Sequence, residues 1–440
     1  MVQQTAPAPD RARTRVAVRA AIAGGIGTVI EYYDFTVYAY LSIVIGPLFF
    51  PSGNPAVSTL SALGVFAGAY VVRPFGGIFF GRVGDRRGRR AALVATVVMT
   101  GTCSVLMGLL PTYATIGVLA PVLLVIVRAL QGFAAGGEVG GAMTYIIESA
   151  PAHRRAFFGA FTPIGTNLGF VLSSSIVGAM TLFLSPAQMS AWGWRIPFLI
   201  CLPLTVVVLV IRLKIQDTEE FLKIADEKKV SKAPFLQMLR TSWRSILVVL
   251  GIGITTNGVA YLGSTYMSIY LQQIVGLPAS IVYWMTAGSI LALCIAMPFV
   301  GLAADRFGRR RVFVFGAVAL IIITYPMLGI IGTASVGVIM ALFVLYMLLS
   351  ATLQVPVFTT IPELFPGPVR YTGVSFGFNV ATVVAGATSP LVATALVAGT
   401  GNHQSPAFWV IGVCIIGLVT VFTMRWPDPK RVLTTTIQVP

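Results

Sequence analysis

Five ionisable side chains stand inside long apolar runs of this sequence, and they are the residue types that bind protons and anions. Glu31 and Asp34 are three residues apart, which places both carboxylates on one face of a helix. Arg73 and Arg128 are the cations, and Glu138 follows Arg128 by ten residues. A charge inside hydrocarbon costs roughly 2.5 to 3.5 kcal/mol unless it is paired or hydrated. The pattern therefore predicts a site for a solute or a proton within a membrane.

Neutral polar side chains take the place of these charges in the second half of the chain. They offer hydrogen bonds and shape, and they are Asn257, Tyr261, Tyr266, Gln354 and Asn379. We expect charge recognition in the first half and hydrogen-bonding selection in the second. Tyr33 and Gln131 complete the candidate solute-binding residues.

A charged motif occurs twice, half a chain length apart. "GRVGDRRGRR" occupies residues 81–90, and "GLAADRFGRR" occupies 301–310 of the 440 residues. A second pair of similar strings begins at Glu148 and at Glu363. Repeats at this spacing predict two structurally similar halves in tandem.

Composition defines the elements that carry these motifs. Hydrophobic residues make up 56% of the chain and its mean hydropathy is +0.88, which is too high for a soluble domain of this size. The apolar runs are about 20 residues or longer, the length of a membrane-spanning helix. We therefore predict an all-α membrane protein with twelve spanning helices. The predicted spans are 18–48, 57–81, 91–111, 116–143, 156–182, 194–213, 245–272, 279–303, 311–331, 334–358, 371–398 and 406–425.

The positions of the basic residues predict how the chain crosses the membrane. The net charge is +16, but most Lys and Arg residues fall in the tails and in every second loop, which argues against nucleic-acid binding. We expect these loops and both termini to be cytoplasmic in a cell-membrane protein. The first apolar run contains Glu31 and Asp34 and no convincing cleavage site, so we interpret it as a retained helix. The predicted parts are a tail (1–17), a first bundle (18–213), a linker (214–244), a second bundle (245–425) and a tail (426–440).

Cysteine and histidine give no sign of a metal site or a cofactor. The four cysteines, at positions 103, 201, 294 and 414, stand singly in different apolar runs and are interpreted as buried filler. His153 and His403 fall in loops, so a proton relay in the membrane has to use carboxylates. Paired histidines, or a nucleophile with its base, are not visible, so we do not expect an enzyme.

The motifs resemble those of the major facilitator superfamily. "GRVGDRRGRR" is similar to its loop signature, and "RALQGFAAGGEVGGAMTYIIESAP" with "GWRIPF" is similar to its metabolite:proton symporter branch. The likeness extends over nearly the whole chain, including "EYYDFTVY" and "RPFGGIFFG". It implies uptake of small organic acids or zwitterions with protons, by alternating access in the membrane.

The repeated motif predicts a conformational latch. Asp85 can accept hydrogen bonds from the N-terminus of a neighbouring helix while it pairs with Arg89, and Gly81 and Gly84 allow the helices to approach closely. Fixing the topology of the loop is the alternative role for these charges. The remaining predicted latch residues are Asp305, Arg309, Glu148, Glu363 and Arg370.

Within this interpretation, the buried charges have assigned roles. Glu138 is the acid nearest in sequence to Arg128 and is the first candidate for proton coupling, followed by Asp34 and then Glu31. Arg73 and Arg128 would bind an organic anion. A structural ion pair remains the alternative for Arg128 and Glu138.

Three further expectations concern the substrate and the partners. A zwitterion such as betaine or proline is the alternative to the organic anion. A nutrient receptor that does not transport is the alternative to a carrier. The expected partners are a small solute, protons and the lipid bilayer, and the expected oligomeric state is a monomer.

Overall fold

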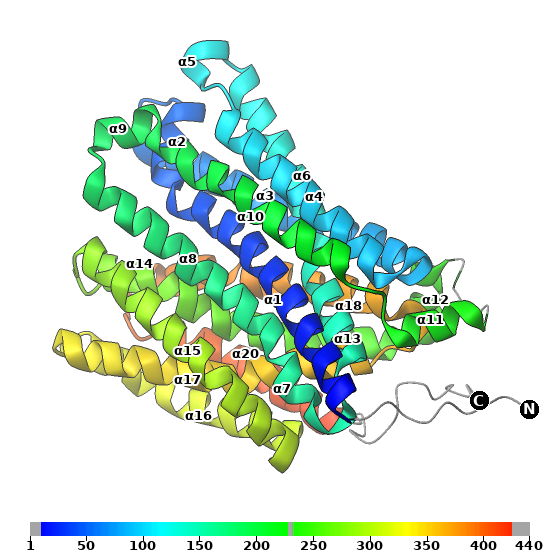
Figure 1. The fold of residues 1–440 in the computed structure, drawn as a ribbon. Helices are drawn as coiled ribbons and strands as arrows, with labels where there is room; N and C mark the ends of the chain where they lie inside the picture. The colour runs from blue at the N-terminus through cyan, green and yellow to red at the C-terminus, as the bar shows by residue number, and fades with distance from the viewer. Residues whose placement is uncertain (1–9, 228–230, 232, 425–440) are drawn as a thin grey trace, which may run out of the picture.

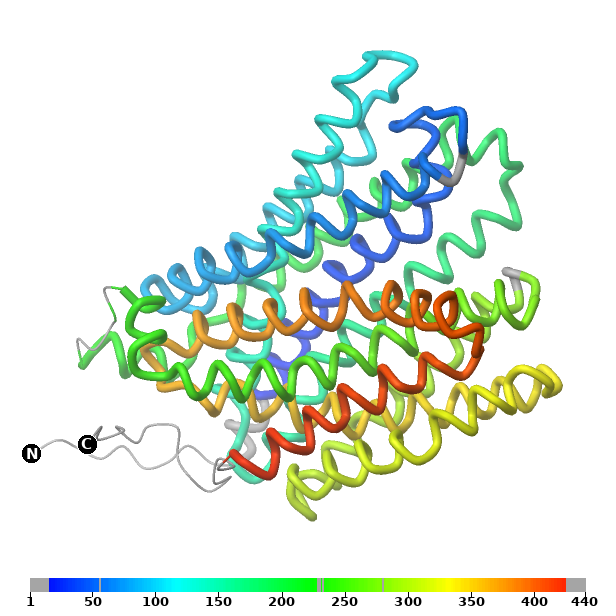
Figure 2. Tube along the Cα trace, turned by 180° about the vertical axis from the view of Figure 1, so that it is seen from behind, coloured from blue at the N-terminus to red at the C-terminus, as the bar shows by residue number. Residues whose placement is uncertain are grey.

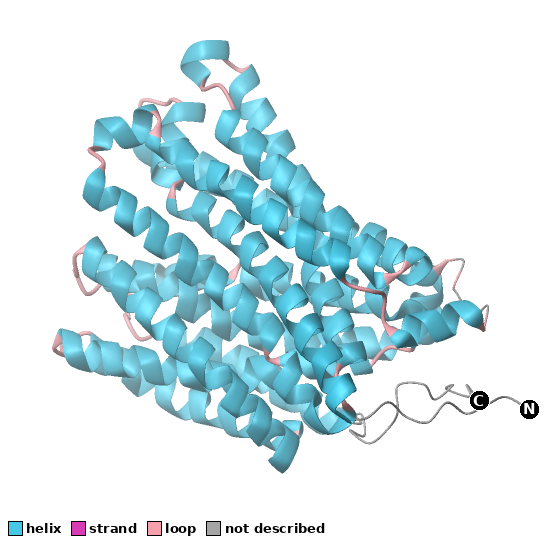
Figure 3. Cartoon of the chain, viewed as in Figure 1, coloured by secondary structure: helices cyan, strands magenta, loops and turns pink. Residues whose placement is uncertain are grey.

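The computed structural model describes residues 10–227, 231 and 233–424, and these residues form helices and turns with no strand (Figure 3). The helices of the first half are α1 (Asp10–Tyr40), α2 (Ser42–Phe49), α3 (Pro55–Arg87), α4 (Arg89–Leu109), α5 (Tyr113–Ile116), α6 (Leu119–Ser149), α7 (Arg155–Gly159), α8 (Phe161–Phe183), α9 (Pro186–Ala191) and α10 (Ile196–Lys214). The linker forms α11 (Glu219–Asp226) and α12 (Pro234–Thr241). The helices of the second half are α13 (Trp243–Tyr261), α14 (Met267–Gln273), α15 (Ala279–Phe307), α16 (Arg309–Ile331), α17 (Val336–Glu363), α18 (Arg370–Ala381), α19 (Ser389–Thr400) and α20 (Pro406–Thr423).

Twelve helical segments cross the bundle, as predicted. Eleven segments of the described chain are long and apolar enough to span a membrane, and α1 packs among them against α8 and α6. The two halves lie one above the other in Figure 1, the first in blue to green and the second in green to red. The view from behind in Figure 2 shows the same division.

The two arginine-rich motifs form single-residue turns, whereas the sequence predicted loops of several residues. α3 continues to Arg87 and α4 begins at Arg89, so only Gly88 separates them. Gly88 has φ = 104° and Gly308, between α15 and α16, has φ = 94°. Residues with a Cβ rarely adopt this conformation, which explains a glycine at both turns. We call this end of the bundle the arginine-rich end.

Four predicted spans are interrupted. The first span breaks at Leu41 between α1 and α2, and the fifth breaks at Ala160 between α7 and α8. The seventh and eleventh spans contain π-helical turns, η3 (Leu262–Tyr266) and η5 (Thr382–Gly386). Such turns inside α-helices are frequent at functional sites.

The linker packs against the helix bundle, so it is more than a solvated tether. α11 and α12 lie beside the arginine-rich end in Figure 1. Asp217 accepts a hydrogen bond from the backbone N–H of Arg90 at 2.9 Å, at the start of α4. α12 contacts both α3 and α18. The linker therefore touches both halves.

Candidate functional site

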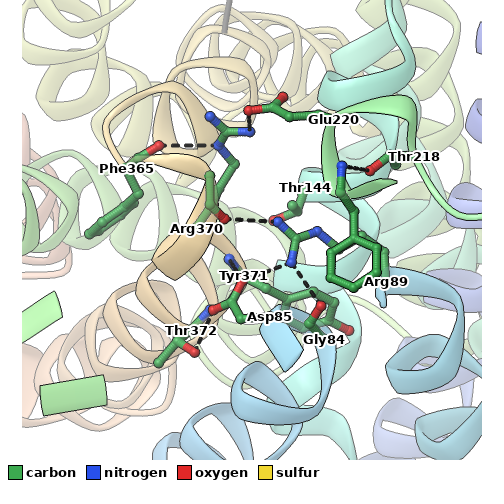
Figure 4. Close-up of polar contacts among 12 residues, drawn as sticks. Gly84, Asp85, Arg89, Thr144, Thr218, Glu220, Phe365, Arg370, Tyr371 and Thr372 are labelled. Atoms are coloured by element: carbon green, nitrogen blue, oxygen red, sulfur yellow. Dashed lines mark hydrogen bonds and ion pairs between the residues drawn. The ribbon is translucent and has the colours of Figure 1, made fainter. Parts of the chain in front are cut away.

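Asp85 joins the two halves at the arginine-rich end. It lies on α3, and its carboxylate accepts hydrogen bonds from the backbone N–H groups of Tyr371 (3.1 Å) and Thr372 (2.9 Å) in the first turn of α18. The Thr372 hydroxyl donates at 2.7 Å and Arg89 donates at 2.8 Å. Figure 4 shows the carboxylate between α18 and Arg89. Asp85 thus makes the contacts predicted from the motif, and the free N–H groups of a helix start stabilise its charge.

A network of ion pairs surrounds the contact between Asp85 and α18. Glu148, at the end of α6, accepts from Arg89 at 3.0 Å and from Arg370 of α18 at 2.9 Å. The linker adds Thr218, which donates to Glu148 at 2.5 Å. It also adds Glu220, which lies 2.6 Å from Arg370 (Figure 4). Burial raises the pKa of the Glu220 carboxyl, and Arg370 opposes this shift. The first half, the second half and the linker are therefore held by one network.

The repeat in the second half lacks the predicted pair of Asp305 and Arg309. Asp305 accepts the backbone N–H groups of Ala156 and Phe157, each at 2.9 Å, from the start of α7. Arg309 does not pair with Asp305. It donates to Glu363 at 2.6 Å instead, because the end of α17 brings this second carboxylate within its reach. Arg155 donates to Glu363 at 3.2 Å from the other half.

A pocket between the halves lies deeper in the bundle. Its cavity volume is about 20 Å³, room for about one water molecule, so the side chains nearly fill it in this arrangement. Its walls come from α1, α8, α13, η3, α17 and α18, so both halves contribute. The lining residues are Tyr32, Thr166, Asn167, Phe170, Thr256, Asn257, Ala260, Tyr261, Ser264, Gln354, Phe358 and Phe378. None of these side chains carries a formal charge.

The ion pair of Glu31 and Arg73 lies behind the pocket wall. Arg73 Nη2 is 3.1 Å from Glu31 Oε1, and both side chains are buried. The guanidinium stacks on the rings of Phe35 (4.0 Å) and Tyr70 (4.5 Å) and lies 5.7 Å from the ring of the pocket residue Tyr32. Within the described part of the chain, neither carboxylate oxygen of Glu31 has a hydrogen-bond partner.

Arg128 lies with Asp34, not with Glu138. Gln131 donates to Asp34 at 2.6 Å and accepts from Arg128 at 2.9 Å, so the amide bridges the two charges. Arg128 also stacks on the ring of Tyr38, 4.1 Å from its centroid. This cluster is buried inside the first half and does not line the pocket.

Glu138 has a different partner from the one that its sequence position suggested. Arg212 of α10 makes a two-fold contact with its carboxylate, and Thr96 of α4 donates to it at 2.6 Å. The sequence did not mark Arg212 as a buried charge, because it stands at the end of its apolar run. Its long side chain is completely buried and crosses between helices to reach Glu138.

The other predicted binding residues divide into two groups. Asn257, Tyr261 and Gln354 line the pocket. Tyr33 donates to the carbonyl of Pro197 at 2.9 Å inside the first half, and Asn379 donates to the Gly136 carbonyl at 2.7 Å across the halves. Their hydrogen bonds therefore hold helices together instead of facing the pocket.

The sequence analysis missed most of the pocket. Asn167 is a polar residue inside a spanning helix, and its polarity was a usable signal in the sequence. In the structure it donates to Gln354 at 2.9 Å across the halves. The aromatic residues gave no such signal. All four cysteines are buried, as predicted, and the described residues contain no cluster of metal ligands.

Comparison with known proteins identifies the family. Residues 20–242 match the family model "Sugar (and other) transporter", and residues 260–438 match "Major Facilitator Superfamily". The chain belongs to the major facilitator superfamily. The proline/betaine transporter of Escherichia coli K12 is 34% identical over 426 residues, which cover 94% of this chain and 84% of the relative. The glycine betaine/proline/ectoine/pipecolic acid transporter OusA of Dickeya dadantii is 33% identical, with the same coverage.

Solved structures of the superfamily share the fold. The proton:xylose symporter XylE bound to 6-bromo-6-deoxy-D-glucose superposes with a TM-score of 0.74 at 17% identity, covering 93% of this chain and 95% of that chain. A partially occluded inward-open form of XylE from E. coli gives a TM-score of 0.66 at 18% identity, covering 93% of this chain and 97% of that chain. The chain is thus a multi-pass membrane transporter of this superfamily.

Proposed function

We propose that this chain is a symporter that takes up a zwitterionic compatible solute, of the betaine and proline class, together with a proton. The observation that carries the proposal is the neutrality of the pocket between the halves. No charged side chain lines it, although Arg73 stands just behind its wall. A solute whose own charges sum to zero suits such a site.

An organic anion, our first expectation from the sequence, fits less well. Arg73 and Arg128 were to balance its charge, but Arg73 is paired with Glu31 and Arg128 is bridged to Asp34. A buried anion without a free cation is costly. The names of the relatives, which are proline and betaine transporters, support the zwitterion as well.

We assign proton coupling to Glu31, with Asp34 as the second candidate. Both stand on α1, and Glu31 has a single ion-pair partner and lies directly before the pocket residue Tyr32. A carboxylate with few partners loses little when it takes up a proton. Glu138, our first candidate from the sequence, is held by Arg212 and Thr96, so we interpret it as structural.

The latch supports alternating access. Its contacts close the arginine-rich end of the bundle, and they join helices that must separate when this end opens. By the charge rule for membrane loops, we infer that this end is cytoplasmic and that both termini are on that side. One chain supplies both walls of the pocket, so we infer that a monomer suffices.

Uptake by proteoliposomes containing the purified full chain tests the proposal. Radiolabelled glycine betaine and proline should accumulate when the outside is acidified, and a protonophore should abolish this accumulation. Accumulation of a dicarboxylate in place of the zwitterions would favour the organic anion. Binding without uptake would favour the receptor.

A further inference from the structure

Five aromatic side chains line the pocket. Tyr32 and Phe170 lie 5.7 Å apart between ring centroids, and Phe170 and Tyr261 lie 6.2 Å apart. These three rings come from α1, α8 and α13. A second group, from α17 and α18, consists of Phe358 and Phe378 at 5.1 Å. All five residues line the pocket, and no carboxylate joins them there.

We propose that these rings form the subsite for the cationic end of the solute and that they select a fully methylated ammonium group. This inference rests on the proposed function, because it concerns the same pocket. A cation placed between the rings has no carboxylate to neutralise it. Attraction to the aromatic faces is then its main electrostatic compensation, and this attraction is strongest where water is excluded.

The hydrogen-bonding groups of the pocket point to the same selectivity. The side-chain oxygen of Gln354 accepts from Asn167 at 2.9 Å, and that of Asn257 accepts from Thr382 at 3.3 Å. A primary or secondary ammonium needs acceptors for its N–H groups, and each of these amide oxygens has only its second lone pair left for one, while no carboxylate lines the pocket. A quaternary ammonium has no N–H group and loses nothing here.

The carboxylate end of a zwitterion finds a donor in the same pocket. The hydroxyl of Thr256 is buried and has no hydrogen-bond partner in the structure. A buried hydroxyl without a partner costs free energy, which a carboxylate oxygen from the solute would recover. The pocket thus offers a free donor for the anion and aromatic faces for a cation without donors.

Phe170 is the residue that tests the inference, because its ring contacts both Tyr32 and Tyr261. The variant Phe170→Leu keeps an apolar side chain and removes the aromatic face, whereas Phe170→Tyr retains the face. Phe79→Leu is the matched control, since Phe79 points away from the core with half of its surface exposed.

The measurement is equilibrium binding to the full chain in nanodiscs, by competition with radiolabelled glycine betaine. The competitors are glycine, sarcosine, dimethylglycine and glycine betaine, which share one carboxylate and differ only in N-methyl groups. We expect affinity to rise along this series by about tenfold or more in total. Phe170→Leu should remove most of the rise, while Phe170→Tyr and Phe79→Leu should preserve it.

Three results overturn the inference. Equal affinity along the series in the wild type, or an equal loss of all four compounds in Phe170→Leu, overturns the methyl selectivity alone and leaves the proposed function intact. Failure of all four compounds and of proline to bind overturns both.

Discussion

The substitution Asp85→Asn should open the arginine-rich end. One carboxylate oxygen of Asp85 accepts from Arg89 and Tyr371, and the other accepts from the backbone N–H and the hydroxyl of Thr372. If the asparagine keeps its oxygen on the first side, its NH₂ group faces the two Thr372 donors. Two hydrogen bonds to a charged acceptor are then lost, at about 1.5 kcal/mol each on the low estimate. The loss of about 3 kcal/mol shifts the ratio of closed to open molecules roughly a hundredfold.

Asp305→Asn is the matched control for this calculation. Asp305 accepts one backbone N–H group on each oxygen, from Ala156 and Phe157, and has no arginine or hydroxyl partner. The same substitution removes one hydrogen bond, so the expected shift is about tenfold. The structure therefore predicts unequal effects from two residues that are equivalent in the sequence repeat.

Pulsed electron paramagnetic resonance can measure both shifts. Spin labels on cysteines at Arg87 and Arg306, which are exposed ends of α3 and α15, report the separation of the halves. Asp85→Asn should add a population at longer distance, and Asp305→Asn should add a smaller one, while substrate affinity stays within a few-fold. The reasoning is refuted if Asp305→Asn has the larger effect, or if Asp85→Asn abolishes binding at unchanged distances.

Four further outcomes follow from the charges and the topology. Glu31→Gln should abolish accumulation driven by a pH gradient but retain solute exchange in proteoliposomes, and retained accumulation would pass the role to Asp34. Glu138→Gln should instead lower the melting temperature, because breaking a buried ion pair costs about 3 to 5 kcal/mol. Burial raises the pKa of Glu220 in the closed network, so the closed state binds a proton more tightly than an open state that exposes this carboxyl, and this contribution to closure is lost as the pH rises through the raised pKa. Acidification should therefore favour the shorter spin-label distance in the wild type and have less effect in Glu220→Gln, and equal pH dependence would contradict this. A cysteine at Gly53 should react with an impermeant reagent outside intact cells, and labelling only after permeabilisation would reverse the proposed orientation.

The contacts of Asp85 could be predicted from the sequence because their signals are local. An aspartate, a glycine turn and an arginine four residues later recur at Asp85 and Asp305, and both aspartates accept backbone N–H groups at a helix start. The pairing of Arg309 with Glu363 could not be predicted, because it depends on where α17 ends relative to α16. Local motifs specify the acceptor but not which distant donor reaches it.

The pocket could not be predicted, because apolar residues on a membrane helix face either lipid or the protein interior. Phe170 and Phe183 both stand on α8, yet Phe170 is 8% exposed and lines the pocket, whereas Phe183 is 83% exposed. Lipid and protein interior are equally apolar, so the residue type does not distinguish the two environments. Arg212 was missed for a related reason, since a long side chain at a helix end can turn either to water or inward.

The charge carried during uptake tests the central claim most directly. A net-neutral zwitterion that moves with one proton transfers one positive charge, whereas a monovalent organic anion moving with one proton transfers none. Proteoliposomes on a solid-supported membrane, at equal pH on both sides, should give a transient current of inward positive charge when glycine betaine is added. A current that is unchanged in Glu31→Gln would pass the coupling role to Asp34, whereas uptake of glycine betaine without current would contradict proton-coupled transport of a zwitterion by this chain.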